Sequence, residues 1–128
     1  MSANRNQKAP AENQYVSFSF DSRILYVKFK GNVHLNYSTA RAIFADRIRY
    51  QEGAPYRVIC DVSGVKSSTK QARDYLAGIG SEILIAIAFI APHHMQNILA
   101  YYLASYITEV PAKIFTSQQQ ALEFLKSF

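Results

Sequence analysis

The chain has 128 residues, 49% of them hydrophobic, so it is long enough for one domain with a hydrophobic core and too apolar for wholesale disorder. Its 14 basic residues outnumber its 9 acidic residues and give a formal net charge of +5. The basic residues are scattered and form no block typical of a nucleic-acid-binding arm. We therefore expect no nucleic-acid partner, and the charge favours acidic partners only slightly.

Cysteine content and hydropathy bear on location. The single cysteine, Cys60, cannot form an internal disulfide, so we expect a reducing, cytoplasmic location. The most apolar window, residues 83–91, is about half of the roughly twenty residues that span a bilayer as a helix, and we predict no membrane span. Residues 1–14 contain no apolar run typical of a secretory signal. We expect them to be a flexible leader before a single domain over residues 15–128.

The first structured segments have the two-residue period of half-buried strands. Residues 15–20 alternate large apolar side chains with serines, and residues 24–30 alternate apolar residues with lysines. The polar residues 21–23 between them suit a tight turn. These segments predict an antiparallel hairpin at a sheet edge, where the exposed lysines discourage association between sheets.

An amphipathic helix follows the hairpin. Residues 31–32, Gly-Asn, end the second strand, and a loop through His34 leads to a helix cap at Asn36 or Ser38. One stripe of this helix is apolar, as expected for a helix that covers one face of a sheet. The stripe consists of Ala40, Ile43, Phe44 and Ile48.

The segment 56–69 is the centre of the predicted fold. Its apolar residues 58–62 run almost without interruption, which is typical of a strand covered on both faces. Ser68 is spaced from Gln71 as in a capping box, and Thr69 is the competing cap of the helix that follows. A pair of glycines ends this helix.

The rest of the chain repeats this plan. Residues 83–90 predict another apolar strand, Pro92 stops it, and residues 93–107 predict a tyrosine-rich helix. Residues 112–115 predict a short final strand, and Ser117 caps the last helix. The order is β-β-α-β-α-β-α-β-α. It predicts an α/β fold with a mostly parallel sheet, an antiparallel edge strand and helices on both faces.

This order, together with the opening hairpin and two short motifs, resembles STAS domains. The motifs are Asp61-Val62-Ser63-Gly64-Val65 and Ile114-Phe115-Thr116-Ser117, the latter followed by Ala121-Leu122. The family includes anti-sigma factor antagonists and the cytoplasmic domains of sulfate transporters. The resemblance covers roughly residues 15–128. It implies a SpoIIAA-like fold and a bacterial, non-catalytic module that binds or regulates another protein.

Members of this family carry a phosphorylatable serine in an Asp-Ser-Ser-Gly motif at the start of the helix after the central strand. The matching stretch here, residues 69–72, reads Thr-Lys-Gln-Ala. Lysine or glutamine therefore occupies the serine position, and the glycine is missing. We transfer no phosphorylation site, since helix capping accounts for the nearby Ser67, Ser68 and Thr69.

Ligands of open α/β sheets bind at the carboxyl ends of the parallel strands. The predicted loops bring histidines, hydroxyls, lysines and an aspartate to this edge, where helix N-termini favour anions. The candidate ligand or partner edge consists of His34, Asp61, Ser63, Lys66, Ser68, Lys70, His93 and His94. Asp61 also suits a turn, and adjacent histidines rarely face one ion, so we predict no metal.

The tyrosine-rich helix is the candidate interface. Tyr101 and Tyr102 project about 100 degrees apart on a helix, so they cannot share one core stripe. The helix is therefore either buried on two sides or part of an interface, where Tyr and Met are enriched. The candidate homodimer interface consists of Met95, Tyr101, Tyr102 and Tyr106.

Three functions are compatible with these features. The preferred one is a non-catalytic STAS-like interaction or regulatory module, with another protein or a second copy as partner and no cofactor. The alternative is a carrier of a small anionic or lipidic ligand, held at the carboxyl-end edge or in an apolar cavity. The third is an enzyme that uses His93, His94 and Asp61, which requires these side chains to converge within hydrogen-bond reach.

Overall fold

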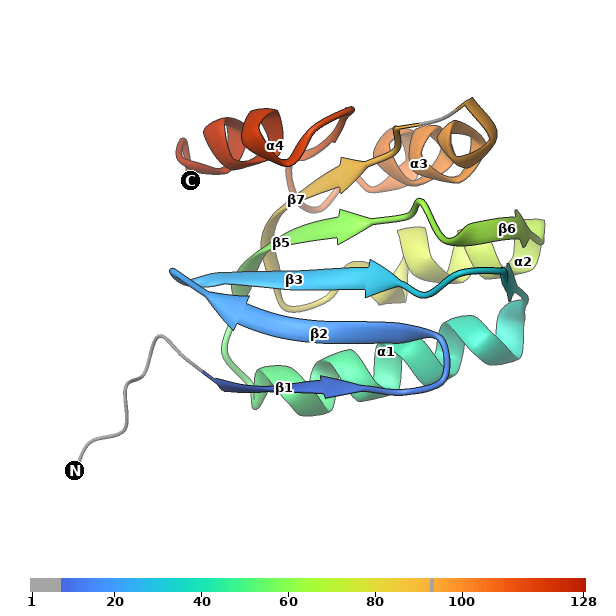
Figure 1. The fold of residues 1–128 in the computed structure, drawn as a ribbon, viewed down its shortest axis with the longest axis horizontal. Helices are drawn as coiled ribbons and strands as arrows, with labels where there is room; N and C mark the ends of the chain where they lie inside the picture. The colour runs from blue at the N-terminus through green and yellow to red at the C-terminus, as the bar shows by residue number, and fades with distance from the viewer. Residues whose placement is uncertain (1–7, 93) are drawn as a thin grey trace.

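The computed structural model of the protein describes residues 8–92 and 94–128, which form a mixed sheet with helices on both faces (Figure 1). The strands of this sheet are β1 (Lys8–Glu12), β2 (Val16–Asp21), β3 (Ile24–Phe29), β5 (Tyr56–Asp61), β7 (Leu84–Ile90) and β8 (Ala112–Phe115). A separate short pair consists of β4 (Val33–Leu35) and β6 (Val65–Ser68). The helices are α1 (Tyr37–Gln51), α2 (Lys70–Ala77), α3 (His94–Tyr106), α4 (Gln118–Leu125) and the 3₁₀ turn η1 (Ile79–Ser81).

The sheet has the predicted mixed topology. Its strand order is β1-β2-β3-β5-β7-β8. β2 pairs antiparallel with both β1 and β3, whereas β3, β5, β7 and β8 run parallel. The mostly parallel sheet with an antiparallel edge is therefore confirmed.

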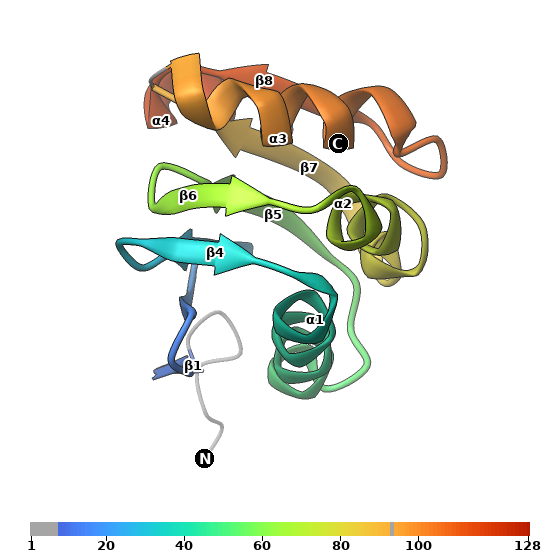
Figure 2. The same ribbon diagram turned by 90° about the vertical axis from the view of Figure 1, so that its right-hand side faces the viewer.

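The helices lie on both faces of the sheet, as predicted. α1, α2 and α3 cover one face and bury the larger core, whereas α4 covers part of the other face (Figures 1 and 2). The alternation of β2 and β3 explains this core, since every second side chain points into it. Within the described residues, no helix combines the length and the hydrophobicity needed to cross a bilayer.

Side-chain caps begin the helices at positions close to those predicted. The Asn36 side chain accepts a hydrogen bond from the Thr39 amide at 2.8 Å, so Asn36 rather than Ser38 caps α1. Thr69 caps α2 through the Ala72 amide, which decides between Thr69 and Ser68. Ser117 caps α4 as predicted. These caps satisfy amides that have no partner within the helix.

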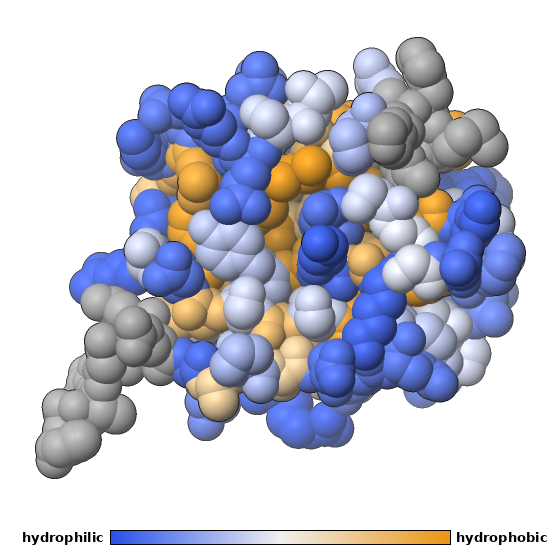
Figure 3. Space-filling model, viewed as in Figure 1, coloured by the Kyte–Doolittle hydropathy of each residue, from blue (hydrophilic) through white to orange (hydrophobic). Residues whose placement is uncertain are grey.

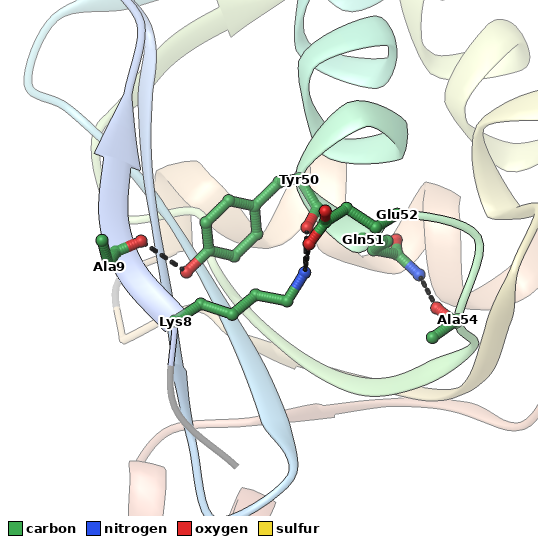
Figure 4. A network of polar contacts seen from close by, with 6 residues as sticks. All are labelled: Lys8, Ala9, Tyr50, Gln51, Glu52 and Ala54. Carbon is green, nitrogen blue, oxygen red and sulfur yellow. Dashed lines mark hydrogen bonds and ion pairs between the residues drawn. The ribbon is translucent and has the colours of Figure 1, made fainter. Parts of the chain in front are cut away.

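Strand β1 lies inside the segment that the sequence assigned to a flexible leader; residues 1–7 of that segment lie outside the described residues. Polar contacts hold the strand against the end of α1 (Figure 4). The Lys8 ammonium donates to the Tyr50 carbonyl at 2.6 Å and to the Glu52 carboxylate at 2.7 Å, and the Tyr50 hydroxyl donates to the Ala9 carbonyl. The side chains of β1 are largely exposed, so its local pattern carried no strand signal.

The turn after β5 packs directly on the backbone at the end of β3. A Cβ atom on Gly64 would lie 2.0 Å from the Lys30 carbonyl oxygen, so only glycine fits. This close approach brings β6 beside β4, and the Val33 amide donates to the Gly64 carbonyl at 3.0 Å. The short β4–β6 pair, which the sequence did not predict, extends the fold beyond the carboxyl ends of β3 and β5.

A buried polar pair at the end of α1 holds the connection from α2 to β7. Arg47 is 6% exposed, and its guanidinium donates to the carbonyls of Gly80 and Glu82 at 2.9 and 3.0 Å. It also donates to the side-chain oxygen of Gln51, which is fully buried. The Gln51 side chain in turn donates to the carbonyl of Ile83 at 2.8 Å. Burial lowers the pKa of Arg47 to about 10, so the guanidinium stays charged at neutral pH.

Replacing Gly64 with alanine tests the close approach of the two turns. We expect Gly64→Ala to lower the free energy of unfolding by roughly 1–3 kcal/mol, because the clash is with backbone atoms that cannot rotate away. Gly31→Ala is the matched control, since nothing lies within 4 Å of the added Cβ. It should change stability by less than about 0.5 kcal/mol. Equal effects of the two substitutions in urea unfolding would contradict this packing.

Candidate functional site

The predicted edge contains a histidine–serine contact between two short strands. His34 lies on β4 and Ser67 on β6, and the His34 Nδ1 atom is 2.8 Å from the Ser67 hydroxyl oxygen. Both side chains are exposed. Figure 2 faces this edge and shows β4 and β6 side by side. The contact joins the two loops that the sequence placed here, although their strands were not predicted.

Asp61 and Ser63 form a turn rather than part of that edge. The Asp61 carboxylate accepts a hydrogen bond from the Ser63 amide at 2.9 Å, the arrangement typical of an Asx turn. Asp61 lines a hollow of about 380 Å³ on the face covered by α4, beside Tyr26 and Lys28. Figure 3 looks onto this face, where hydrophobic surface shows between polar side chains. The structure therefore separates Asp61 from the groove lined by Lys66 and Ser68.

Lys66 and Ser68 lie instead in a groove between β6 and α3, here called the β6 groove. It has a volume of about 330 Å³. Its lining residues are Val65, Lys66, Ser67, Ser68, Arg73, Ile98 and Leu99. Lys70 lies just beyond it and forms an exposed ion pair with Asp74 at 2.9 Å, which raises the pKa of Lys70. The groove is therefore basic and hydroxyl-rich, with an apolar wall supplied by α3.

Arg73 is the residue of this groove that the sequence did not single out. Its guanidinium donates to the Ser68 carbonyl and hydroxyl at 2.7 and 2.9 Å, while its Nε atom is buried without a hydrogen-bond partner among the described residues. Arg73 lies four residues after the Thr69 cap. A basic residue at this spacing, one turn into a helix, points back toward the preceding strand. The four-residue spacing between Thr69 and Arg73 is therefore the sequence signal that could have identified Arg73.

Tyr102 connects the groove to α3. Its hydroxyl donates to the Asp74 carboxylate, which raises the pKa of Tyr102 and lowers that of Asp74. The Arg73 guanidinium lies 4.9 Å from the centre of the Tyr102 ring, and this ring packs on Tyr106 with centroids 4.6 Å apart. Tyr102 is therefore held in place by α2, and it supports its neighbour Tyr106.

The outer face of α3 carries an exposed apolar stripe. Ile98, Tyr101 and Tyr106 are 63%, 64% and 62% exposed, and with the half-buried Tyr102 we call them the α3 stripe. The opposite face of the helix is buried in the core, through Leu99, Ala100, Leu103 and Ile107. α3 is therefore buried on one side only, and large aromatic side chains remain on the other.

The remaining candidates lie outside the described residues. His93 lies outside them altogether, and so do the side chains of His94 and Met95, whose backbone begins α3. In the part of the chain that the structure describes, no three His, Cys, Asp or Glu side chains cluster as metal ligands would.

An internal cavity lies between the sheet and the helices α1 to α3. Its volume is about 60 Å³, and its lining is almost entirely apolar apart from Arg47, Ser81 and Cys60. Pockets for drug-sized ligands usually measure about 300–1,000 Å³.

Burial raises the pKa of the Cys60 thiol to about 12, so this cysteine is a neutral, unreactive thiol at physiological pH.

Comparisons with known proteins agree with this fold. The family model described as "Domain of unknown function (DUF7793)" matches residues 18–128. A solved structure from Shewanella loihica PV-4, an uncharacterised protein of the DUF3478 family with a SpoIIAA-like fold, is similar with a TM-score of 0.61 and 18% identity. The similarity covers 98% of each chain, and it confirms the STAS-like resemblance at the level of the fold. No curated protein is similar enough to count as a match.

The reactivity of Cys60 tests the burial of the central strand. At pH 8 we expect Ellman's reagent to modify the native protein far more slowly than the urea-unfolded protein. With a pKa of about 12, the folded thiol has a thiolate fraction about a thousandfold below that of a free thiol. Rapid modification under native conditions would contradict this burial.

Proposed function

The chain belongs to the DUF7793 family of domains of unknown function and has a SpoIIAA-like fold, and we propose that it is a non-catalytic protein-interaction module. Its binding surface is the α3 stripe together with the adjoining β6 groove. The observation that carries this proposal is the exposure of Ile98, Tyr101 and Tyr106 on one face of a helix whose other face is buried. Exposed apolar surface bordered by polar residues is typical of protein-binding sites.

The composition and rigidity of this surface support the proposal. Tyrosine is enriched in interface cores because its ring buries a large area while its hydroxyl can still hydrogen-bond. Tyr102 is fixed by its contacts with Asp74 and Arg73, and Tyr106 packs on it. A surface that is ordered before binding loses less side-chain entropy when its partner arrives.

The contacts of the predicted edge residues support a role without catalysis. Asp61 accepts from the Ser63 amide within a turn, and Ser68 accepts from Arg73 at the start of α2. His34 contacts a serine across a two-stranded pair. These contacts connect backbone segments, as structural hydrogen bonds do. The His34–Ser67 contact does join an imidazole to a hydroxyl, but no third group among the described residues orients the imidazole, as a catalytic pair of nucleophile and base requires.

The internal cavity favours a second candidate function, the carriage of a small ligand. Its apolar lining suits an apolar molecule, and the Arg47 guanidinium would attract an anionic end. The volume of about 60 Å³ is the reason we place this function second, because a lipid chain would need the helices to move apart. Native mass spectrometry of the freshly purified chain separates the two, since a carrier would retain a defined additional mass.

Site-specific photocrosslinking tests the interaction surface. We expect a benzoylphenylalanine in place of Tyr101 to give one protein adduct of defined mass on irradiation of the living cells. The same group in place of Phe128 is the matched control, because Phe128 is also an exposed aromatic residue, 45% exposed, but lies after α4 on the other face of the sheet. Adding Ile98→Glu to the Tyr101 variant should remove the adduct. Equal adducts at both positions, or none at Tyr101, would contradict the proposal.

A further inference from the structure

The α3 stripe is flanked by two hollows of opposite charge. At its amino-terminal end lies the β6 groove, with Lys66 and Arg73. At its carboxyl-terminal end lies a larger hollow of about 760 Å³, here called the η1 hollow, which contains Glu82, Glu109 and the half-exposed Ile79.

The exposed charges in the two hollows have no ion-pair partner within the described residues, whereas the Arg73 guanidinium is engaged with Ser68. Lys66, Glu82 and Glu109 are exposed, and none of them forms an ion pair with another described residue. A partner that fits both hollows therefore presents acidic groups at one end and a basic group at the other.

Both hollows lie on the same flank of α3, the one that faces α2. Tyr102 contacts Arg73 and Asp74 of α2 at the first hollow, and Tyr106 lines the second hollow beside the end of α2. The rings of Tyr102 and Tyr106 pack together between them. The flank therefore runs from positive to negative along α3, a helix of 13 residues and about 20 Å.

We infer that this surface binds a second copy of the chain, with the two α3 helices antiparallel about a two-fold axis. Such an axis is perpendicular to the helices. It places the α2-facing flank of one copy opposite the same flank of the second copy, so that the positive end of one flank lies beside the negative end of the other. The β6 groove of one copy then faces the η1 hollow of the other, and Lys66 meets Glu109 twice in the dimer. With parallel helices the two-fold axis would run along them and place each flank opposite the other flank of the second copy, so only the antiparallel arrangement brings hollows of opposite charge together.

The apolar side chains of the stripe suit the same arrangement. With the ends exchanged, Ile98 of one copy reaches the hollow in which the second copy exposes Ile79 and Tyr106. Tyr101 lies midway along the stripe and therefore near the two-fold axis. Helices pack with axes 8–10 Å apart, a distance at which these side chains interdigitate. This inference rests on the proposed function, since it names the partner of the same surface.

Charge reversal tests the inference by sedimentation equilibrium of the full chain, whose monomer mass is 14.5 kDa. We expect a dimer for the natural sequence. Lys66→Glu and Glu109→Lys should each weaken it by at least about tenfold in Kd, because each places two like-charge pairs in the interface. Lys28→Glu, an exposed lysine on β3 at the face covered by α4, is the matched control and should leave Kd unchanged.

Mixing the two weakened variants gives the sharper result. A Lys66→Glu chain and a Glu109→Lys chain are complementary at both contacts, so the mixture should form a heterodimer while each variant alone stays monomeric. The inference would be overturned if no heterodimer formed, or if neither charge reversal changed the Kd of the dimer. A monomeric natural chain would also overturn it. If the natural chain is a monomer, a photocrosslinked adduct between the Tyr101 position and a different protein would still support the proposed function. The absence of any adduct would contradict both the proposed function and the dimer.

Discussion

The buried pair formed by Arg47 and Gln51 is the interaction on which the placement of the helices depends. A buried guanidinium is costly unless its N–H groups find acceptors, and here carbonyls of the α2–β7 connection and the Gln51 side chain provide them. The Phe44 ring, 5.4 Å from the guanidinium carbon, gives further stabilisation. Because the pair binds backbone rather than side chains, it fixes the path of residues 80–83 independently of their identity.

That path has structural consequences at the proposed binding surface. Ile83 adopts a left-handed backbone conformation, with a φ of 62°, and its carbonyl accepts from Gln51 just before β7 begins. At the other end of α2, the Thr69 amide donates to the Leu35 carbonyl, which anchors the helix to β4. α2 is therefore held at both ends. Through Asp74 and Arg73 it then positions Tyr102, and with it the α3 stripe.

The polar side chains at the carboxyl-end edge of the sheet serve mainly to hold the backbone in place. Its hydroxyls and carboxylates are largely engaged in holding turns and helix starts, as Asp61 and Ser68 are. Within the described part of the chain, what remains free is charge without an ion-pair partner and apolar surface on α3. A surface of this kind binds another surface more readily than it activates a small molecule, and this balance underlies the proposed role as an interaction module.

The sequence by itself determined the hairpin, the parallel core strands, the approximate starts of the helices and the placement of helices on both faces of the sheet. These features are encoded locally, since a two-residue or 3.6-residue period and a capping side chain act within a few residues of one another. Only the tertiary structure decided the strand at Lys8–Glu12, the β4–β6 pair and the burial of Arg47. Each of these depends on backbone groups 30 or more residues away, as the contacts of Arg47 with the Gly80 carbonyl and of Lys8 with the Tyr50 carbonyl show. The residues of the candidate site are separated for the same reason. Sequence order placed Asp61 and Lys66 at one edge of the sheet, but the turn at Gly64 places them in different hollows.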